Sequence, residues 1–486
     1  MIQKQNDDAG AGSPNHTSET SLASQPSGFW RDIRDAVRGT QHDYTQGPIG
    51  RAILLLAVPM VIEMMMESIF AVVDVFFVGQ LGAAAVATVG LTESLMIVIY
   101  TIAFGLSIGA TATVARRIGE KDPDAAARAA VQVLALGALV SAIIGVCGAI
   151  YAPELLALMG ADAEIIAIGT PFARVSLAAS STAFLIFLVN AVFRGAGDPA
   201  VAMRVLILGN GLNIVLCPVF IFGLGPVPEM GLVGAAVATT IGRGTGFLYA
   251  LWLLARGTGH LAVTRAHLRL EPTTMLSIAR LSGWGTLQVA LSSMSWIALV
   301  RVTASFGASA LAGYTIAVRI LLFALMPAFG IGAAAATMVG QSLGAGLPDR
   351  AERSVWTAAR INVVLLTLTC VVFVTFAPTM VRWFSHDAAV IAIGTYGLRA
   401  MSLGFPLYAL GMVLEQAFNG AGDTRTPTWI NFGVFWAVQI PLAWFLATRT
   451  AIAERGVFLA VPIAYSTLAV VSALLFRRGR WKTKVV

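Results

Sequence analysis

The tetrapeptide Gly-Ala-Gly-Asp occurs twice in this chain, at 195–198 and again at 420–423. The interval of 225 residues between the two copies also aligns most of one half of the chain with the other half. It places Gly105 on Gly330 and Gly119 on Gly344, and it matches 166–170 with five identical residues at 391–395. An offset that holds over so long a stretch indicates two copies of one structural unit.

Composition indicates that this unit lies in a membrane. The chain is 57% hydrophobic and 12% charged, whereas a soluble domain carries about 25% charged residues. Several runs have no charge at all, namely 129–153, 205–228, 361–381, 426–448 and 456–476. Each is long enough for a helix that crosses a bilayer, which needs roughly 20 residues. Helices are expected because lipid cannot satisfy free backbone N–H and C=O groups.

The runs and the repeat together predict twelve membrane spans, six in each copy. We expect them at 52–78, 84–116, 125–151, 165–193, 199–222, 231–256, 275–305, 310–339, 354–376, 388–419, 424–447 and 456–476. A unit with six spans returns to the side where it started, so the two repeats are parallel and related by a pseudo-twofold axis along the membrane normal. The predicted fold is an all-α polytopic membrane protein whose two six-helix repeats surround a central cleft.

The predicted domains follow from these spans. They are a disordered cytoplasmic tail at 1–46, a first lobe at 47–256, a linker at 257–273, a second lobe at 274–477, and a basic tail at 478–486. Within the first tail, Phe29 and Trp30 precede an Arg/Asp pattern that is typical of a short interfacial helix.

Arginine and lysine predict the orientation. They occur before the first span, in the even-numbered connections and after the last span, and they are absent from the first, third, fifth and seventh connections. The positive-inside rule then places both termini in the cytoplasm. We expect a multi-pass protein of the cell inner (plasma) membrane and a monomer. The net charge of +7 reflects contact with anionic lipid and not with nucleic acid.

Five carboxylates fall within predicted spans: Glu63, Glu67, Asp74, Glu93 and Glu415. An acid in a bilayer is costly unless it faces water or a partner, and it commonly marks an ion path. The three acids of the first span lie within about 40° of one another around a helix. We predict that the five couple transport to a cation. The alternative is structural ion pairing, because arginines also lie in the spans, among them Arg243 and Arg319.

The fold is duplicated but its charge is not. Glu63 aligns with Gln288, and Glu415 aligns with Asn190. This asymmetry suggests that one lobe handles the coupling ion, which is H⁺ or Na⁺ because carboxylates can bind either. No other cofactor is expected, and no firm metal site is predicted.

Other residues give further expectations. The Gly-Ala-Gly-Asp segments should form tight turns in which Gly adopts a positive φ and Asp caps the next helix. Gln288, Asn190, Met64 and Trp296 are predicted to contact substrate, because amides, a flexible thioether and an aromatic ring suit varied organic molecules.

Several motifs, taken in order, resemble those of the multidrug and toxic compound extrusion (MATE) transporters. Val73-Asp74 followed by Phe77-Val78-Gly79 is similar to the first-span pattern of that family. The paired Phe-x-Gly-Ala-Gly-Asp segments, Asn213 with Ile221-Phe222-Gly223, and Gly231-x-x-Gly-Ala-Ala236 also resemble it. The resemblance extends from about residue 50 to about residue 450.

This resemblance implies a transporter and not an enzyme. It implies two lobes that rock around the cleft and export organic, often cationic or amphipathic, compounds in exchange for H⁺ or Na⁺. It also gives Asp74 and Asn213 the place of the coupling site, where Na⁺ is a possible ligand. Many bacterial members carry an Asp four residues after that Asn, whereas this chain has Cys217. We therefore expect Glu63, Glu67 and Glu93 to rebuild the site.

A lipid-linked saccharide flippase of the same superfamily is the alternative function. It would share the repeats and the lobes. Arg301 and Arg319 could serve a pyrophosphate group, whereas the acids of the first lobe argue against an anionic cargo.

Overall fold

A computed structural model describes residues 28–39 and 42–484 of the chain. A short helix, α1 (Phe29–Arg38), precedes the bundle. The remaining helices in chain order are α2 (Ile49–Gly79), α3 (Ala83–Gly119), α4 (Pro123–Ile150), α5 (Ala152–Leu158), α6 (Ala163–Ala178), α7 (Ser180–Ala196), α8 (Pro199–Phe222), α9 (Gly231–Arg256), η1 (Arg265–Leu268), α10 (Pro272–Ala304), α11 (Ala308–Gly344), α12 (Pro348–Arg382), α13 (Ala388–Ser402), α14 (Phe405–Gly420), α15 (Arg425–Asn431), η2 (Phe432–Gln439), α16 (Ile440–Arg449), α17 (Arg455–Arg477) and η3 (Arg480–Thr483).

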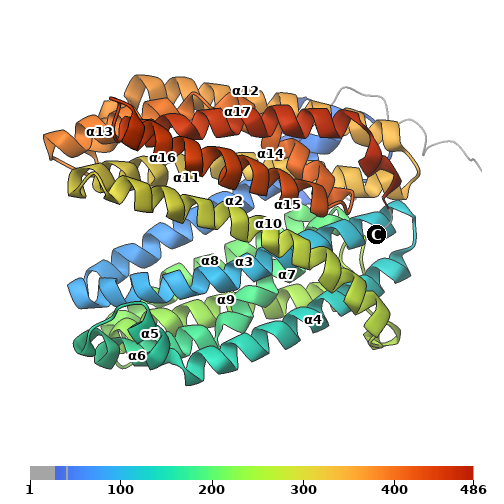
Figure 1. The fold of residues 1–486 in the computed structure, drawn as a ribbon. Helices are drawn as coiled ribbons and strands as arrows, with labels where there is room; N and C mark the ends of the chain where they lie inside the picture. Colours follow the sequence, from blue (N-terminus) through green and yellow to red (C-terminus); the bar gives the residue numbers. More distant parts are fainter. Residues whose placement is uncertain (1–27, 40–41, 485–486) are drawn as a thin grey trace, which may run out of the picture.

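The predicted all-α fold with two six-helix repeats is confirmed. Ten stretches among the described residues are single spans by length and hydropathy, and the pair α13 and α14, bent by 53°, makes an eleventh. The twelfth is α9, whose mean hydropathy is lowered by its glycines, its threonines and the buried Arg243. Figure 1 shows the long helices lying roughly along one direction, with α3 to α9 in one group and α11 to α17 in the other.

Each group has its own hydrophobic core. One core gathers buried residues from α3 to α9, among them Phe184, Phe193 and Leu253. The other gathers residues from α11 to α17, among them Phe405, Phe418 and Phe458. These two cores, together with a smaller buried cluster of the first lobe that includes Val78, Phe172 and Cys217, divide the bundle into a first lobe and a second lobe.

The first helix of each lobe begins in the core of the other lobe. Ile53 of α2 is buried in the second core, and Ile278 of α10 is buried in the first core. These two isoleucines are 225 residues apart and are therefore equivalent in the repeat. The exchange was not expected from the lobe boundaries at 256 and 274. It adds α2 with α11 and α10 with α3 to the direct contact of α3 with α11 as helix pairs that join the lobes.

The predicted tail at 1–46 is described only in part. Residues 1–27 lie outside the described residues. Residues 29–38 form the short helix that the Arg/Asp pattern suggested.

Candidate functional site

Glycines bring the two lobes into backbone contact, and they do so in symmetric pairs. A Cβ atom at Gly105 of α3 would lie 2.5 Å from the backbone nitrogen of Thr286 on α10. A Cβ atom at Gly330 of α11 would lie 2.8 Å from the backbone nitrogen of Val61 on α2. Both distances are too short for any side chain. Because Gly105 and Gly330 are equivalent in the repeat, as are Val61 and Thr286, the lobes meet across a pseudo-twofold axis.

A second symmetric pair closes the ends of α3 and α11. A Cβ atom at Gly119 would lie 2.8 Å from the carbonyl carbon of Gln341. A Cβ atom at Gly344 would lie 2.9 Å from the backbone nitrogen of Glu120. Gln341 also donates its side-chain N–H to the carbonyl of Gly195 at 3.0 Å. We call this end of the bundle, next to the two Gly-Ala-Gly-Asp turns, the closed end.

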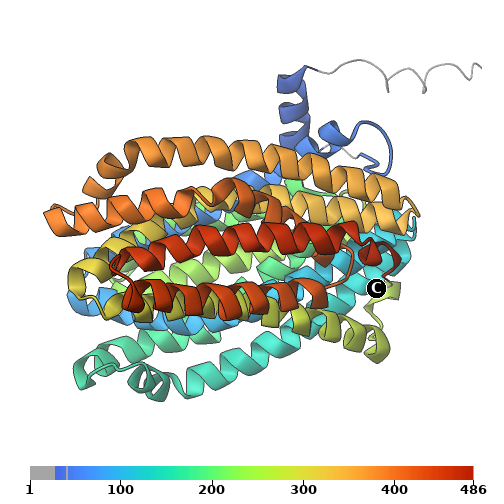
Figure 2. The same ribbon diagram turned by 45° about the horizontal axis from the view of Figure 1, so that its top comes forward.

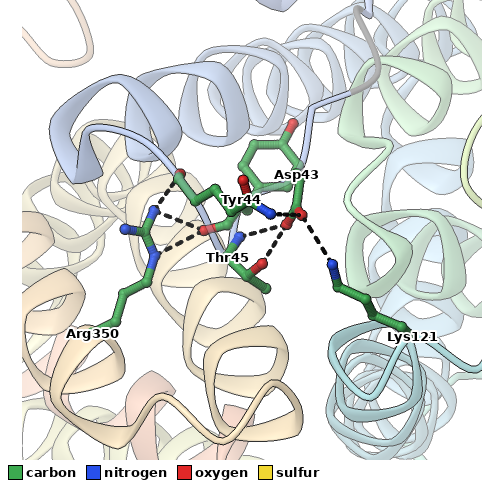
Figure 3. Close-up of polar contacts among 6 residues, drawn as sticks. Asp43, Tyr44, Thr45, Lys121 and Arg350 are labelled. Carbon is green, nitrogen blue, oxygen red and sulfur yellow. Dashed lines mark hydrogen bonds and ion pairs between the residues drawn. The ribbon is translucent and has the colours of Figure 1, made fainter. Parts of the chain in front are cut away.

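A short segment at 43–47, which we call the terminal strap, crosses the closed end (Figure 3). The Asp43 carboxylate lies 3.6 Å from the Lys121 ammonium of the first lobe. Arg350 of the second lobe donates to the carbonyls of Tyr44 at 2.9 Å and Gln46 at 2.6 Å. The strap therefore bonds to both lobes. Side chains also form hydrogen bonds between the two lobes at this end. In the described part of the chain, the Thr337 hydroxyl donates to the carbonyl of Arg194, which lies next to the first Gly-Ala-Gly-Asp turn.

The two Gly-Ala-Gly-Asp turns fit the prediction in their glycines but not in their acids. Gly197 and Gly422 have φ values of +89° and +82°, as expected for tight turns. Asp198 does not cap α8, and this part of the prediction is wrong. Its carboxylate instead accepts hydrogen bonds from the backbone N–H of His260 at 2.7 Å and from the ring Nδ1 at 2.8 Å.

The second turn uses its acid in the same way. The Asp423 carboxylate lies 3.3 Å from the Lys484 ammonium and accepts a hydrogen bond from the hydroxyl of Thr426 at 2.7 Å. Thus each turn binds the segment that leaves its own lobe, the linker in one case and the C-terminal tail in the other. The hydrogen bond with Asp198 raises the pKa of His260 above 6.5, against the opposing effect of burial.

Two of the three acids on α2 form ion pairs within the first lobe. Glu63 lies 2.5 Å from the Arg194 guanidinium of α7 and is fully buried. Glu67 lies 2.6 Å from the Arg243 guanidinium of α9 and accepts the side-chain N–H of Asn210 on α8 at 3.0 Å. These pairs neutralise both acids and fix α2 against its own lobe. The structural alternative from the sequence thus describes the geometry of Glu63 and Glu67.

Asp74 is the acid on α2 that no guanidinium contacts among the described residues. The sulfur of Cys217 on α8 lies 3.9 Å from its carboxylate. Four residues earlier on α8, the Asn213 amide donates to Thr239 at 3.0 Å, and its carbonyl oxygen is buried without a hydrogen bond. The exposed Glu93 of α3 has no ion pair in the described chain. These groups offer oxygen atoms for a proton or Na⁺, although no cluster of three metal-binding side chains occurs in the described chain.

The second lobe holds one acid of the same kind. Glu415 of α14 is 9% exposed, and its Oε1 is buried without a hydrogen-bond partner. Tyr408 lies two turns earlier on the same face of α14 and stacks on Tyr465 of α17 with ring centroids 4.1 Å apart. Asn190, the equivalent of Glu415 in the first lobe, is fully buried and likewise has no side-chain hydrogen bond among the described residues.

The predicted substrate residues lie on the three helices α2, α7 and α10, and none of them lines the groove between α2 and α11. Gln288 is buried on α10, Met64 is half-buried on α2, and Trp296 packs beside the second core. That groove has a volume of about 320 Å³. Its lining is mostly apolar: Met65, Ser68, Ile69, Val72, Val73, Phe323, Met326 and Pro327.

Some functional features were missed from the sequence. Arg194 was placed after the fourth span and was not recognised as the partner of Glu63. One signal was available in the repeat. The second copy has Asn419 in place of Arg194 and Gln288 in place of Glu63, so both charges are absent from it together. Among the groove residues, Met65 belongs to the methionine run 64–66, which suits a flexible lining for substrates, whereas Met326 gave no signal of its own.

Two lobes joined by symmetric glycine contacts, with acids buried in their spans, are the architecture of a membrane transporter built from repeats. The MatE family model matches residues 59–219 and 286–445, which is one match in each lobe. The chain belongs to this family, the multidrug and toxic compound extrusion transporters, as its motifs suggested. Its relatives are transporters and not enzymes.

Individual relatives agree along nearly the whole chain. The probable multidrug resistance protein YoeA of Bacillus subtilis is 25% identical over 445 residues, which are 90% of this chain and 95% of that protein. A MOP superfamily transporter from Pyrococcus furiosus has 27% identity and a TM-score of 0.85, covering 91% of this chain and 98% of the other. A multidrug resistance MATE family transporter in an outward-facing conformation has 27% identity and a TM-score of 0.84, covering 90% and 96%. The relatives named for multidrug resistance favour efflux over the flippase alternative.

Proposed function

We propose that this protein is an antiporter that exports organic, cationic or amphipathic compounds in exchange for H⁺ or Na⁺. The observation that carries the proposal is the environment of Asp74. It is the acid on α2 without a guanidinium partner in the described chain, and it faces the thiol of Cys217. A carboxylate in a medium of low dielectric is stabilised by binding a cation. Asp74 is therefore available to take up and release the coupling ion.

The five predicted acids divide into two groups under this proposal. Glu63 and Glu67 hold helices through Arg194 and Arg243, because a tightly paired carboxylate has little to gain from a second cation. Asp74 and Glu415 lack such partners and serve the ion. Glu93 is exposed and has no ion pair in the described chain, so it too is available to the ion.

Alternating access would use the closed end as its inner gate. The positive-inside pattern assigns this end to the cytoplasm of an inner-membrane protein. The lobes touch there through glycines, Gly119 and Gly344 among them, and opening would have to release the bonds of the terminal strap to one lobe. The apolar groove with Met65 and Met326 offers a flexible surface to an organic cargo. We propose that the protein works as a monomer.

The test is transport in inside-out membrane vesicles that contain the full chain. A fluorescent organic cation is followed while a proton gradient and then a sodium gradient is imposed. We expect one gradient to drive uptake in the parent and Asp74→Asn to lower that uptake about tenfold or more, which corresponds to one coupling interaction of a few kcal/mol. Glu154→Gln, an exposed acid on α5, is the matched control and should transport like the parent.

Three results would contradict the proposal. The first is full gradient-driven uptake in both Asp74→Asn and Glu415→Gln. The second is uptake that neither gradient affects. The third is movement of a labelled polyprenyl-linked saccharide in place of the cation, which would support the flippase.

A further inference from the structure

The helix α1 sorts its side chains by kind around its circumference. At 100° per residue, Arg31, Arg34 and Arg38 fall within an arc of about 60°. Phe29, Ile33, Val37 and Trp30 occupy the neighbouring arc, and Asp32 and Asp35 occupy a third arc on the other side of the arginines. Such a division is typical of a helix that lies in the surface of a membrane.

The acidic side of α1 faces the protein. The Asp32 carboxylate lies 3.0 Å from the Arg51 guanidinium of α2, and the Asp35 carboxylate lies 3.7 Å from it. Ala36 is buried, and a Cβ atom at Gly39 would lie 2.9 Å from Cβ of Ala200 on α8. The helix is therefore seated on α2 and α8, and its orientation is fixed.

The opposite side of α1 has no partner among the described residues. Phe29 is 60% exposed and Trp30 is 79% exposed. Arg31, Arg34 and Arg38 are exposed, and none of them forms an ion pair within the described chain. Figure 2 shows α1, in dark blue, standing out from the bundle and across the direction of the long helices. Since those helices cross the bilayer, α1 extends along the plane of the membrane.

We propose that this face of α1 binds the membrane interface and selects anionic lipid headgroups. Phe29 and Trp30 enter the boundary between headgroups and acyl chains, where aromatic rings are favoured. The three arginines lie beside them and meet lipid phosphates, and each charge near an anionic surface contributes about a fivefold preference. The charge on this face is purely basic, because both aspartates turn to Arg51 on the side of the helix that faces the protein. A zwitterionic surface has no net charge, so it would gain little from a helix face whose charged side chains are all arginines.

The test uses the full-length protein in lipid nanodiscs and bromine-labelled lipids, which quench tryptophan fluorescence at short range. The signal of Trp30 is obtained as the difference between the parent and Trp30→Phe, because the chain has 10 tryptophans. We expect brominated phosphatidylglycerol to quench this signal about twofold or more beyond brominated phosphatidylcholine. The triple variant Arg31→Gln/Arg34→Gln/Arg38→Gln should bring the two lipids to the same quenching.

The matched control is Arg265→Gln/Arg269→Gln, which removes exposed charge from the linker and should keep the preference for phosphatidylglycerol. Retention of that preference in the triple variant would overturn the proposal, as would a Trp30 signal that neither lipid quenches. A preference lost in the linker control as much as in the triple variant would also overturn it, because the effect would then be one of net charge. None of these readouts depends on transport.

Discussion

The carboxylate of Asp74 and the sulfur of Cys217 lie 3.9 Å apart, one on α2 and the other on α8. Cys217 lies four residues after Asn213, at the position where the resemblance to MATE transporters implies an Asp in many bacterial members. This chain therefore has one carboxylate at a place where such relatives would have two. The proposed coupling ion is left with Asp74 as its charged ligand in this part of the lobe.

The thiol itself should matter little for transport. A contact of 3.9 Å between sulfur and oxygen is a weak hydrogen bond, worth less than about 1 kcal/mol. We expect Cys217→Ser and Cys217→Ala to keep gradient-driven transport within about fivefold of the parent. Initial uptake rates in vesicles measure this effect. Loss of coupling in Cys217→Ala with activity kept in Cys217→Ser would show that the polar atom at position 217 is required.

The ion pair between Glu67 and Arg243 should stabilise the first lobe and not serve the ion. Arg243→Gln leaves the Glu67 carboxylate without its partner, and breaking a buried pair costs about 3–5 kcal/mol. We expect the lower part of that range, since Glu67 is 24% exposed. The double variant Glu67→Gln/Arg243→Gln should lose less stability than Arg243→Gln alone, as measured by unfolding in denaturing detergent.

The control for this cycle is Arg360→Gln, which removes an exposed arginine of α12 with no ion pair among the described residues. Its free energy of unfolding should stay within about 0.5 kcal/mol of the parent. An additive double variant would contradict direct pairing of Glu67 with Arg243.

The terminal strap should hold the closed end together. Arg350 donates to three strap carbonyls, those of Tyr44, Gln46 and Gly47, so Arg350→Ala should free the strap. We expect amide exchange at 43–47 to quicken about tenfold or more, as for the loss of one or two charged hydrogen bonds. Arg353→Ala removes an exposed arginine that bonds only within its own helix. Equal rates of amide exchange at 43–47 in Arg350→Ala and Arg353→Ala would contradict a role for Arg350 in holding the strap.

The strength of the hydrogen bond between the His260 ring and the Asp198 carboxylate should depend on pH. The hydrogen bond with Asp198 raises the pKa of His260 above its ordinary 6.5, and Asp43 adds to this effect. A raised pKa means that the charged imidazole contributes its full stabilisation below about pH 6.5 and loses it as pH rises through the higher folded value. NMR of labelled histidine should show the pKa of His260 falling in Asp198→Asn. An unchanged titration in that variant would contradict this hydrogen bond.

The repeat was the strongest guide from sequence to fold. One offset of 225 residues predicted two parallel six-helix units, and the same offset relates the contacts of Gly105 and Gly330 in the structure. It could not predict that Ile53 and Ile278 exchange between cores, because the crossing of α2 and α10 is set by packing between lobes and not by periodicity within a helix.

The site was less accessible from the sequence. Helical periodicity placed Glu63, Glu67 and Asp74 on one face, but it carries no information about which helices that face meets. Glu63 pairs with Arg194, which is 131 residues away. The cap predicted for Asp198 failed because His260, from a linker far along the chain, offers two donors to the same carboxylate.

The central claim is that cargo and coupling ion compete through the carboxylate of Asp74. It is tested most directly by adding an organic cation to the purified protein in weakly buffered solution and measuring the ions released. We predict that the parent releases about one H⁺, or one Na⁺ when preloaded with sodium, for each cation bound, as reciprocal linkage requires. Asp74→Asn should bind the cargo and release neither ion. Release of the same amount from Asp74→Asn would contradict the account.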